Sequence, residues 1–184
     1  IATLDHEIGL LLDQLRQRNR LRNTIVVITS DHGEAFGEQG IYGHGSALYM
    51  PMLQVPLIIA WAEGLQESYR EQAWVSTRDL PTTLIRMVAA SEATEFPGQS
   101  LFTRSTTSQR LPDTLFAGSR FAANNPPWYP VSKGDLEGVL VQELMLIREA
   151  DGRRELYDLR ADPAMGQNLW AEAGQQRAGQ TLDQ

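Results

Sequence analysis

The sequence contains no cysteine and no long apolar run, and its basic residues are outnumbered by acidic ones. Without cysteine, these residues hold no disulfide, no thiolate metal ligand and no cysteine nucleophile. The longest apolar stretch, residues 55–62, is far shorter than the roughly 18 residues that identify a membrane span. With 16 Lys and Arg against 23 Asp and Glu, the net charge is −7, which opposes binding to nucleic acid phosphates. We therefore expect no nucleic acid partner and no membrane span in these residues.

The first residues predict a fragment. No basic leader with an apolar core opens the sequence, so we expect any export signal or anchor to lie outside these 184 residues. Apolar residues recur at helical spacing in residues 3–18 and predict an amphipathic helix. Because Ile1 and Ala2 provide no capping box before it, we interpret the chain as cut inside or just before this helix.

An unbroken apolar run at residues 25–28 gives the strongest structural signal. Such a run predicts a strand buried on both faces, as in parallel α/β sheets, and the helix before it indicates the second half of a βαβ unit. Residues 55–61 predict a second buried strand, with Pro56 near its start. A helix follows, for which Asp79 is the expected N-cap and Pro81 lies in the first turn. The first part of the chain thus predicts an α/β core.

The second part of the chain predicts antiparallel β structure. Residues 91–111 are rich in Ser, Thr, Glu, Gly and Pro, so we divide the chain there into a core portion, 1–110, and a smaller subdomain, 111–184. Short runs predict four strands, at residues 115–121, 138–141, 144–148 and 155–159. Asp151 and Gly152 predict a turn between the last two strands. We also expect a long loop at residues 124–130 and a terminal helix at residues 168–177.

Asp31 and His32 follow the first predicted strand at its carboxyl end, where ligands bind in open α/β sheets. A carboxylate oxygen and an imidazole nitrogen together suit a divalent cation. Two ligands are too few for a tight site, and the Asp and Asn spacing of an EF-hand is absent. For an isolated Asp-His pair, a loop cap with a local hydrogen bond is the commoner role. We expect Glu34 and Glu38 to be solvated or to support ligands.

His44 changes that balance in favour of function. It lies between Gly43 and Gly45, which allow the backbone to approach a ligand closely. The chain has only three histidines, and two of them fall within this short segment, whereas His6 on the first helix is expected to be a solvated surface residue. We therefore predict a functional loop that contains both His32 and His44.

A series of motifs extends along nearly the whole chain. The first are TIVVITSDHGE at residues 24–34, FGEQG at 36–40, GHG at 43–45 and VPLII at 55–59. Later ones are DLPTTL at 79–84, PGQSL at 97–101, LYDL at 156–159, DP at 162–163 and NL at 168–169. In sequence and order, these motifs resemble the sulfatases of the alkaline phosphatase superfamily. Several ordered motifs are far more specific than one tripeptide.

The resemblance implies the C-terminal portion of an alkaline phosphatase-like α/β sandwich, followed by a small antiparallel β subdomain with a terminal helix. It also implies that Asp31 and His32 supply half of a metal site, completed by an Asp pair in the N-terminal half of the same protein. Calcium is the expected ion, although a histidine ligand also admits zinc or manganese. In this family a basic residue thirteen positions after the Asp contacts the sulfate or the departing oxygen. His44 holds that position, as a catalytic and substrate-binding residue, where most sulfatases have lysine.

The resemblance further implies a formylglycine nucleophile in the N-terminal half, made from Cys or Ser. These residues contain no Ser-x-Pro-x-Arg motif and no comparable Thr motif, so we expect the fragment alone to be inactive. For the full-length protein we expect hydrolysis of anionic sulfate esters. The family also implies a periplasmic, secreted or membrane-anchored extracytoplasmic location.

Two alternatives stay open at this point. Histidine at position 44 also resembles the phosphoethanolamine transferases and other phosphate-handling relatives, such as phosphoryl transferases and phosphodiesterases. Members of the transferase group would use a threonine nucleophile on a phosphate ester. The alternative of another class is a non-catalytic binding module that kept the scaffold and lost the chemistry. The identity of the substrate is not set by these residues.

Overall fold

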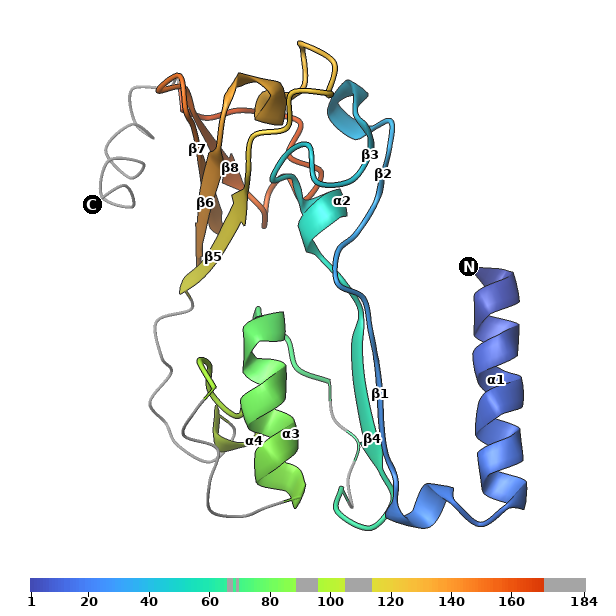
Figure 1. Cartoon of the computed structure of the whole chain (residues 1–184). Helices are drawn as coiled ribbons and strands as arrows, with labels where there is room; N and C mark the ends of the chain where they lie inside the picture. The colour runs from blue at the N-terminus through green and yellow to red at the C-terminus, as the bar shows by residue number, and fades with distance from the viewer. Residues whose placement is uncertain (66–67, 69, 89–95, 105–113, 171–184) are drawn as a thin grey trace. The chain divides into compact units, whose positions relative to one another are not determined.

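The computed structural model describes residues 1–65, 68, 70–88, 96–104 and 114–170. The chain forms two compact units, one from residues 1–30 and 56–72 and the other from residues 31–55 and 73–184 (Figure 1). We call them unit 1 and unit 2 and describe each by itself. Residues 105–113 lie outside the described part, and the boundary expected near residue 110 stays a prediction. No helix of the described residues has both the length and the apolar character needed to span a membrane.

Unit 1 begins with helix α1, Ala2–Gln17, within one residue of the predicted bounds at each end. Ile1 is its N-cap and makes no side-chain cap hydrogen bond, as the sequence predicted. A 3-10 helix at Leu21–Asn23 then leads into strand β1, Ile25–Thr29. The apolar side of α1 is not covered: none of its residues is buried, and Leu4 and Leu11 are 64% and 56% exposed.

Strand β1 pairs with β4, Leu57–Trp61, and the pairing is antiparallel, with Ile25 opposite Trp61 and Thr29 opposite Leu57. The βαβ pattern concerned the connection through α1, so the pairing of β1 with β4 does not test it. The expectation of burial on both faces was wrong, because both strands are only partly buried and Ile58 is 54% exposed. An apolar run identifies a strand, but the direction of its partner depends on how the intervening chain returns.

Unit 2 begins with the glycine-rich segment, which forms a short hairpin. Strand β2, Ala35–Phe36, pairs antiparallel with β3, Tyr42–Gly43, around a 3-10 helix at Glu38–Gly40. Gly37 and Gly40 have positive φ angles of 122° and 70°, which glycine adopts without the steric cost that a Cβ would bring. Helix α2, Met50–Leu53, follows the hairpin.

A four-stranded antiparallel sheet forms the rest of the core of unit 2, in the order β5-β6-β7-β8. Its strands are β5, Thr114–Ser119; β6, Leu136–Val141; β7, Leu144–Glu149; and β8, Arg154–Asp158. These bounds confirm the four predicted strands, each within two residues at either end. The Asp151-Gly152 turn is confirmed as well, because Gly152 has a φ of 88° and donates its N–H to the Glu149 carbonyl.

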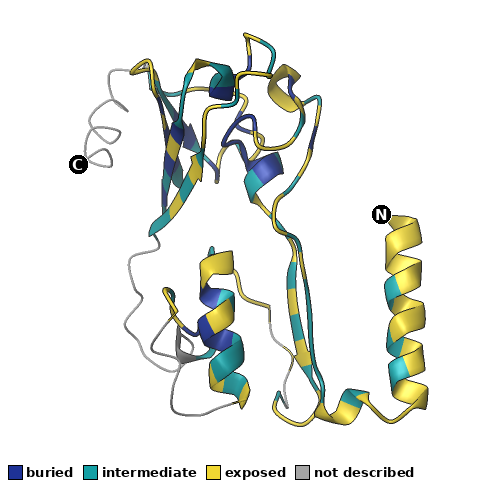
Figure 2. Ribbon diagram, in the orientation of Figure 1, coloured by how far each residue is buried: buried dark blue, intermediate teal, exposed yellow. Residues whose placement is uncertain are grey.

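The hydrophobic core lies between this sheet and the segment that contains α2 (Figure 2). In β6 the buried residues alternate with exposed or partly buried ones, so one face of the sheet is apolar. Each large apolar side chain that is fully buried contributes about 1.5–3 kcal/mol to stability. The fully buried side chains are Leu136, Met145, Leu156, Met165, Val131, Thr83 and Ser46. The segment before and within α2 is thus held against a folded core.

Helix α3, Leu80–Val88, was predicted to begin with Asp79 as its N-cap, and this was wrong. A 3-10 helix at Thr77–Asp79 precedes it, and Ser76 caps that turn by accepting the Arg78 N–H. Asp79 is buried and accepts the backbone N–H of Gln99 at 2.9 Å instead. The Asp79 and Gly98 motifs are therefore joined, just before helix α4, Leu101–Arg104. A long-range partner outcompetes the local cap, which a sequence pattern cannot reveal.

The last described residues fasten the end of β8 through side-chain and backbone hydrogen bonds. Asp158 accepts the backbone N–H groups of Arg160 and Ala161 at 3.0 and 3.3 Å. The Asn168 side chain accepts the Leu156 N–H at 3.1 Å, and its neighbour Leu169 donates to the Leu156 carbonyl at 2.8 Å. Residues from 171 onward lie outside the described part, and so does most of the terminal helix predicted at 168–177.

Candidate functional site

Asp31 and His32 come directly after β1 in the chain and open unit 2. The backbone here is tied to α2, because Gly33 donates its N–H to the Met52 carbonyl at 2.9 Å. A Cβ on Gly33 would lie only 2.1 Å from the Pro51 carbonyl oxygen, so only glycine permits this approach. The position of Asp31 and His32 is thus set by a close contact between two backbones.

The Asp31 and His32 side chains have polar atoms close enough to share a cation. His32 donates its backbone N–H to Asp31 Oδ1 at 3.1 Å, while Asp31 Oδ2 lies 3.8 Å from His32 Nε2. Two ligands about 2.0–2.5 Å from one ion can be this far apart. His32 Nδ1 donates to the Gly33 carbonyl at 2.9 Å, so Nε2 carries the lone pair of the neutral ring. A hydrogen bond from the second ring nitrogen to a carbonyl is typical of metal-binding histidines.

The structure brings His44 to His32. Their imidazole rings stack with centroids 4.0 Å apart and an interplanar angle of 26°. His44 Nδ1 also lies 3.0 Å from Glu34 Oε2. A carboxylate can only accept, so the His44 Nδ1 atom carries the proton in this contact. The predicted loop therefore places residues 31, 32 and 44 in one neighbourhood, and their roles stay predictions.

Glu34 contacts His44 directly, a partner that the sequence did not specify. It was expected to be solvated or to support ligands, and its contact with His44 is compatible with the second of these roles. The register of the hairpin explains this, because Ala35 lies opposite Gly43 and the next pair outward is Glu34 and His44. Facing residues of an antiparallel pair lie on the same face of the hairpin. The sequence signal for this hairpin was the pair of residues at 35 and 36, one apolar and one aromatic, followed by a glycine.

The hairpin that carries His44 is anchored to the rest of unit 2 by hydrogen bonds from three residues. Tyr129 is buried, and its hydroxyl accepts the Tyr42 N–H at 3.0 Å and donates to the Tyr42 carbonyl at 3.3 Å. Ser119 donates to the Gly45 carbonyl at 2.7 Å. Val131 donates its N–H to the Ser46 carbonyl at 3.1 Å. The backbone is therefore held on both sides of His44.

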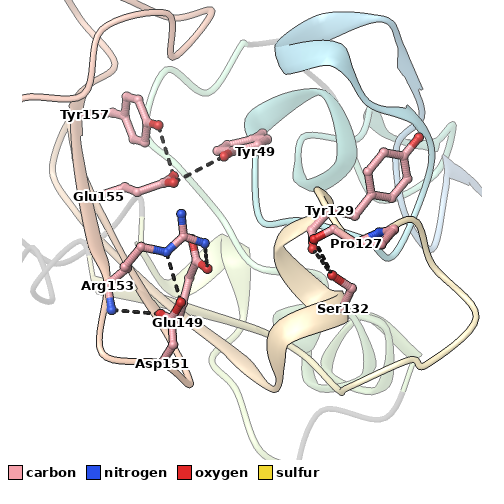
Figure 3. Close-up of polar contacts among 9 residues, drawn as sticks. All are labelled: Tyr49, Pro127, Tyr129, Ser132, Glu149, Asp151, Arg153, Glu155 and Tyr157. Atoms are coloured by element: carbon pink, nitrogen blue, oxygen red, sulfur yellow. Dashed lines mark hydrogen bonds and ion pairs between the residues drawn. The ribbon is translucent and has the colours of Figure 1, made fainter.

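The loop at residues 124–130 was predicted, and its anchoring function was not. In Figure 3, Ser132 lies beside the backbone of Tyr129 and Pro127 and donates to their carbonyls at 2.7 and 3.0 Å. These bonds fix the turn at the end of the loop, in the 3-10 helix at Pro130–Lys133. The identity of Tyr129 as an anchor of the hairpin was not predicted from the sequence.

A second polar cluster in unit 2 connects α2 with the sheet (Figure 3). Tyr49 and Tyr157 donate to the two oxygens of Glu155, at 3.4 and 3.0 Å. Burial raises the pKa of both phenols well above the ordinary value of 10.0, and the Glu155 carboxylate adds to the effect. Both hydroxyls therefore stay protonated and act as donors. These bonds join α2 to β8, and we regard the cluster as structural.

Glu149 is a buried acid at the end of β7. Burial raises the pKa of its carboxyl group above the ordinary value of 4.5, while the ion pair with Arg153 opposes this shift. Arg153 also contacts Asp151 at 3.1 Å, and the backbone N–H of Arg153 lowers the pKa of Asp151 (Figure 3). The two acids and the arginine thus fasten the β7–β8 turn.

Comparison with known proteins finds similarity to one family. The family model described as Sulfatase matches residues 1–89. A sulfatase of Formosa agariphila is 28% identical over 163 residues, which cover 89% of this chain and 29% of that protein. The N-acetylglucosamine-6-O-sulfatase of Bacteroides thetaiotaomicron is 26% identical over 176 residues, or 94% of this chain and 31% of that protein. The first 89 residues of this chain thus match the sulfatase family.

This chain spans about a third of the length of these relatives. Solved structures confirm its alkaline phosphatase-like α/β fold. The protein BT4656 in complex with D-glucosamine-2-N,6-O-disulfate has a TM-score of 0.82 at 24% identity, over 97% of this chain and 36% of that one. The phosphonate monoester hydrolase of Agrobacterium radiobacter has a TM-score of 0.77 at 21% identity, over 98% of this chain and 37% of that one. The same fold therefore supports both sulfate and phosphonate chemistry.

Proposed function

We propose that the complete protein is a metal-dependent sulfatase that hydrolyses sulfate esters, and that this chain supplies half of its metal site and a substrate-contacting histidine. The observation that carries the proposal is the meeting of His32 and His44, from positions twelve residues apart, in a chain whose first 89 residues match the sulfatase family. The nucleophile, a formylglycine on this proposal, belongs to the N-terminal part of the complete protein.

Asp31 and His32 would hold the cation. Their donor set, one carboxylate oxygen and one imidazole nitrogen at 3.8 Å, fits a divalent ion, with calcium preferred and zinc or manganese compatible with the histidine. When bound, such an ion supplies positive charge that neutralises the sulfate oxygens. Asp31 is 86% exposed at its side chain, so it can complete a site with residues from the rest of the protein.

His44 would act on the departing oxygen. Its Nδ1–H is engaged by Glu34 at 3.0 Å, which turns the opposite ring nitrogen, Nε2, away from that carboxylate. A protonated imidazole can donate from Nε2 to the ester oxygen as the bond to sulfur breaks. The family's usual lysine would provide only a flexible point charge, whereas the His44 ring is directional and is held by Glu34 and by the stacked His32 ring.

The printed functions of the relatives suggest which esters to test first. One curated relative is an N-acetylglucosamine-6-O-sulfatase, and one structural neighbour is in complex with a glucosamine disulfate. We therefore propose amino-sugar sulfates as the first substrates to assay for the complete protein. We also propose an extracytoplasmic location, in line with the family.

The rival proposal is a phosphoryl transferase, phosphodiesterase or phosphonate hydrolase of the same fold. Two observations favour it: His44 stands where most sulfatases have lysine, and phosphonate monoester hydrolases share the fold with TM-scores of 0.77 and 0.79. A non-catalytic binding module is the alternative of another class.

Turnover assays on the complete protein, with sugar sulfates, aryl sulfates and phosphonate or phosphate esters, would separate these proposals. We expect sulfate release to be the fastest reaction, and we expect Asp31→Ala to lose both bound metal and turnover. Faster release of phosphate or phosphonate would support the rival. A protein that binds no metal and turns over none of these esters would support the non-catalytic module.

A further inference from the structure

The hairpin brings together a group of side chains that differs from the pair proposed above. His32, Glu34 and His44 each offer a ligand atom, and these atoms all lie within 4.8 Å of one another. No other group of three or more such residues occurs in the part of the chain that the structure describes. Asp31 is not a member of this group.

The donor set selects a particular class of ion. Two imidazole nitrogens and one carboxylate oxygen suit zinc and other borderline transition-metal dications, whereas calcium prefers oxygen ligands alone. His44 Nδ1 and Glu34 Oε2, 3.0 Å apart, are already spaced as two ligands of one ion at about 2.0–2.2 Å. The ion would replace the proton that these two atoms now share.

The scaffold holds the backbone at or beside all three ligands and leaves their side chains adjustable. Glu34 and His44 face each other by the register of β2 and β3, and the Gly33–Met52 hydrogen bond fixes the backbone beside His32. His32, Glu34 and His44 have 43%, 42% and 53% of their side chains exposed, so small rotations that close the 4.8 Å span disrupt no core packing. The Nδ1–H of His32 donates to the Gly33 carbonyl, which directs Nε2 to the ion.

We propose that His32, Glu34 and His44 form a binding site for zinc or a similar transition-metal dication, with a ligand set distinct from the Asp31–His32 pair. One consequence rests on the proposed function. Because His32 belongs to both sets and His44 would contact the substrate, zinc at this site excludes the functional cation from His32 and removes His44 from catalysis. Zinc would then inhibit the complete enzyme.

Isothermal titration of ZnCl₂ into the 184-residue chain tests the ligand set without any enzymatic readout. We expect one zinc ion per chain, and we expect Glu34→Gln and His44→Ala to weaken binding by about tenfold or more, since each removes a ligand. Asp31→Asn should change the affinity by less than about threefold, because Asp31 is outside the set. Far-UV circular dichroism checks that each variant keeps its fold.

Two matched variants test whether zinc binding weakens on the loss of any histidine or glutamate, rather than on the loss of a ligand. His6→Ala removes the third histidine, which lies on α1, and Glu38→Gln changes a hairpin carboxylate that is not in the group but accepts the Phe36 N–H. Both should bind zinc like the parent. An absence of stoichiometric zinc binding would overturn the proposal. So would weakening by Asp31→Asn without weakening by Glu34→Gln, which would place zinc on the Asp31–His32 pair and leave the proposed function intact.

Discussion

Unit 1 and unit 2 use their apolar residues in opposite ways. None of the described residues of unit 1 is buried, although α1 carries an apolar stripe and β1 and β4 are rich in branched apolar residues. All buried core residues of the described chain lie in unit 2, and they include the segment directly after His44. The candidate site is therefore carried by the unit that has its own core, so its geometry depends on packing within unit 2.

The largest expected difference between the units comes from removing an apolar side chain. Leu156→Ala in unit 2 should lower the free energy of unfolding by about 2–5 kcal/mol, because this side chain is fully buried. Leu11→Ala in unit 1 should change it by less than about 0.5 kcal/mol, because Leu11 is 56% exposed. Urea unfolding followed by circular dichroism measures both values. Similar losses for the two variants would show that the contrast in burial is not a contrast in stability.

Two glycine variants, one in each unit, test how closely the backbone is packed. Gly33→Ala should destabilise the chain by about 1–3 kcal/mol, because the new Cβ would meet the Pro51 carbonyl oxygen at 2.1 Å. Gly9→Ala in α1 meets nothing within 4 Å and should stabilise the helix by up to about 1 kcal/mol. Thermal unfolding of the two variants should therefore shift in opposite directions. A shift in the same direction would refute the close approach at Gly33.

We expect the Tyr129 anchor of the hairpin to contribute less to the free energy of unfolding than the Leu156 side chain or the close backbone contact at Gly33. Tyr129→Phe removes the hydroxyl that bonds both backbone groups of Tyr42, at an expected cost of about 1–2 kcal/mol. Limited proteolysis should also cut residues 36–45 faster in this variant. The matched control is Tyr42→Phe, which loses a hydroxyl from a side chain that is 69% exposed and should behave like the parent. Equal proteolysis of both variants would argue against the anchor.

The smallest expected effect concerns pH. In the folded chain the pKa of Glu149 is raised above 4.5, the ordinary value that applies to the unfolded chain. Between these two pKa values, the folded chain keeps a proton that the unfolded chain releases. The free energy of unfolding therefore falls as pH rises through this range. Glu149→Gln removes this titration. The melting temperature of the variant minus that of the parent should therefore increase from pH 4 to pH 7. A constant difference would mean that Glu149 titrates alike in the folded and unfolded chains.

Local sequence patterns predicted the helices and strands well, but they predicted poorly which strands pair and which side chains form long-range contacts. The spacing of apolar residues was enough for α1 and for β5 to β8, because each element is defined by its own residues. The antiparallel pairing of β1 with β4 was not predicted, and the cap assigned to Asp79 was wrong. Both depend on chain segments about 20 or more residues away, which a local pattern does not contain.

The candidate site shows the same limit. Asp31, His32 and His44 were selected from the sequence because their residue types and motifs are distinctive. The contact of Glu34 with His44 depends on the register of a hairpin whose strands have two residues each. The anchor at Tyr129 lies 87 positions from Tyr42. Their identities alone, a glutamate after a glycine and a tyrosine in a proline-rich loop, are common in surface loops.

A crystal structure of the complete protein, grown with calcium and an unreactive sulfate ester, would show whether Asp31, His32 and His44 act as proposed. We predict a cation bound by the Asp31 and His32 side chains, with the ring of His44 within hydrogen-bond distance of an ester oxygen of the ligand. Side chains at 31 and 32 that point away from His44, with the ion and the ester bound elsewhere, would contradict it.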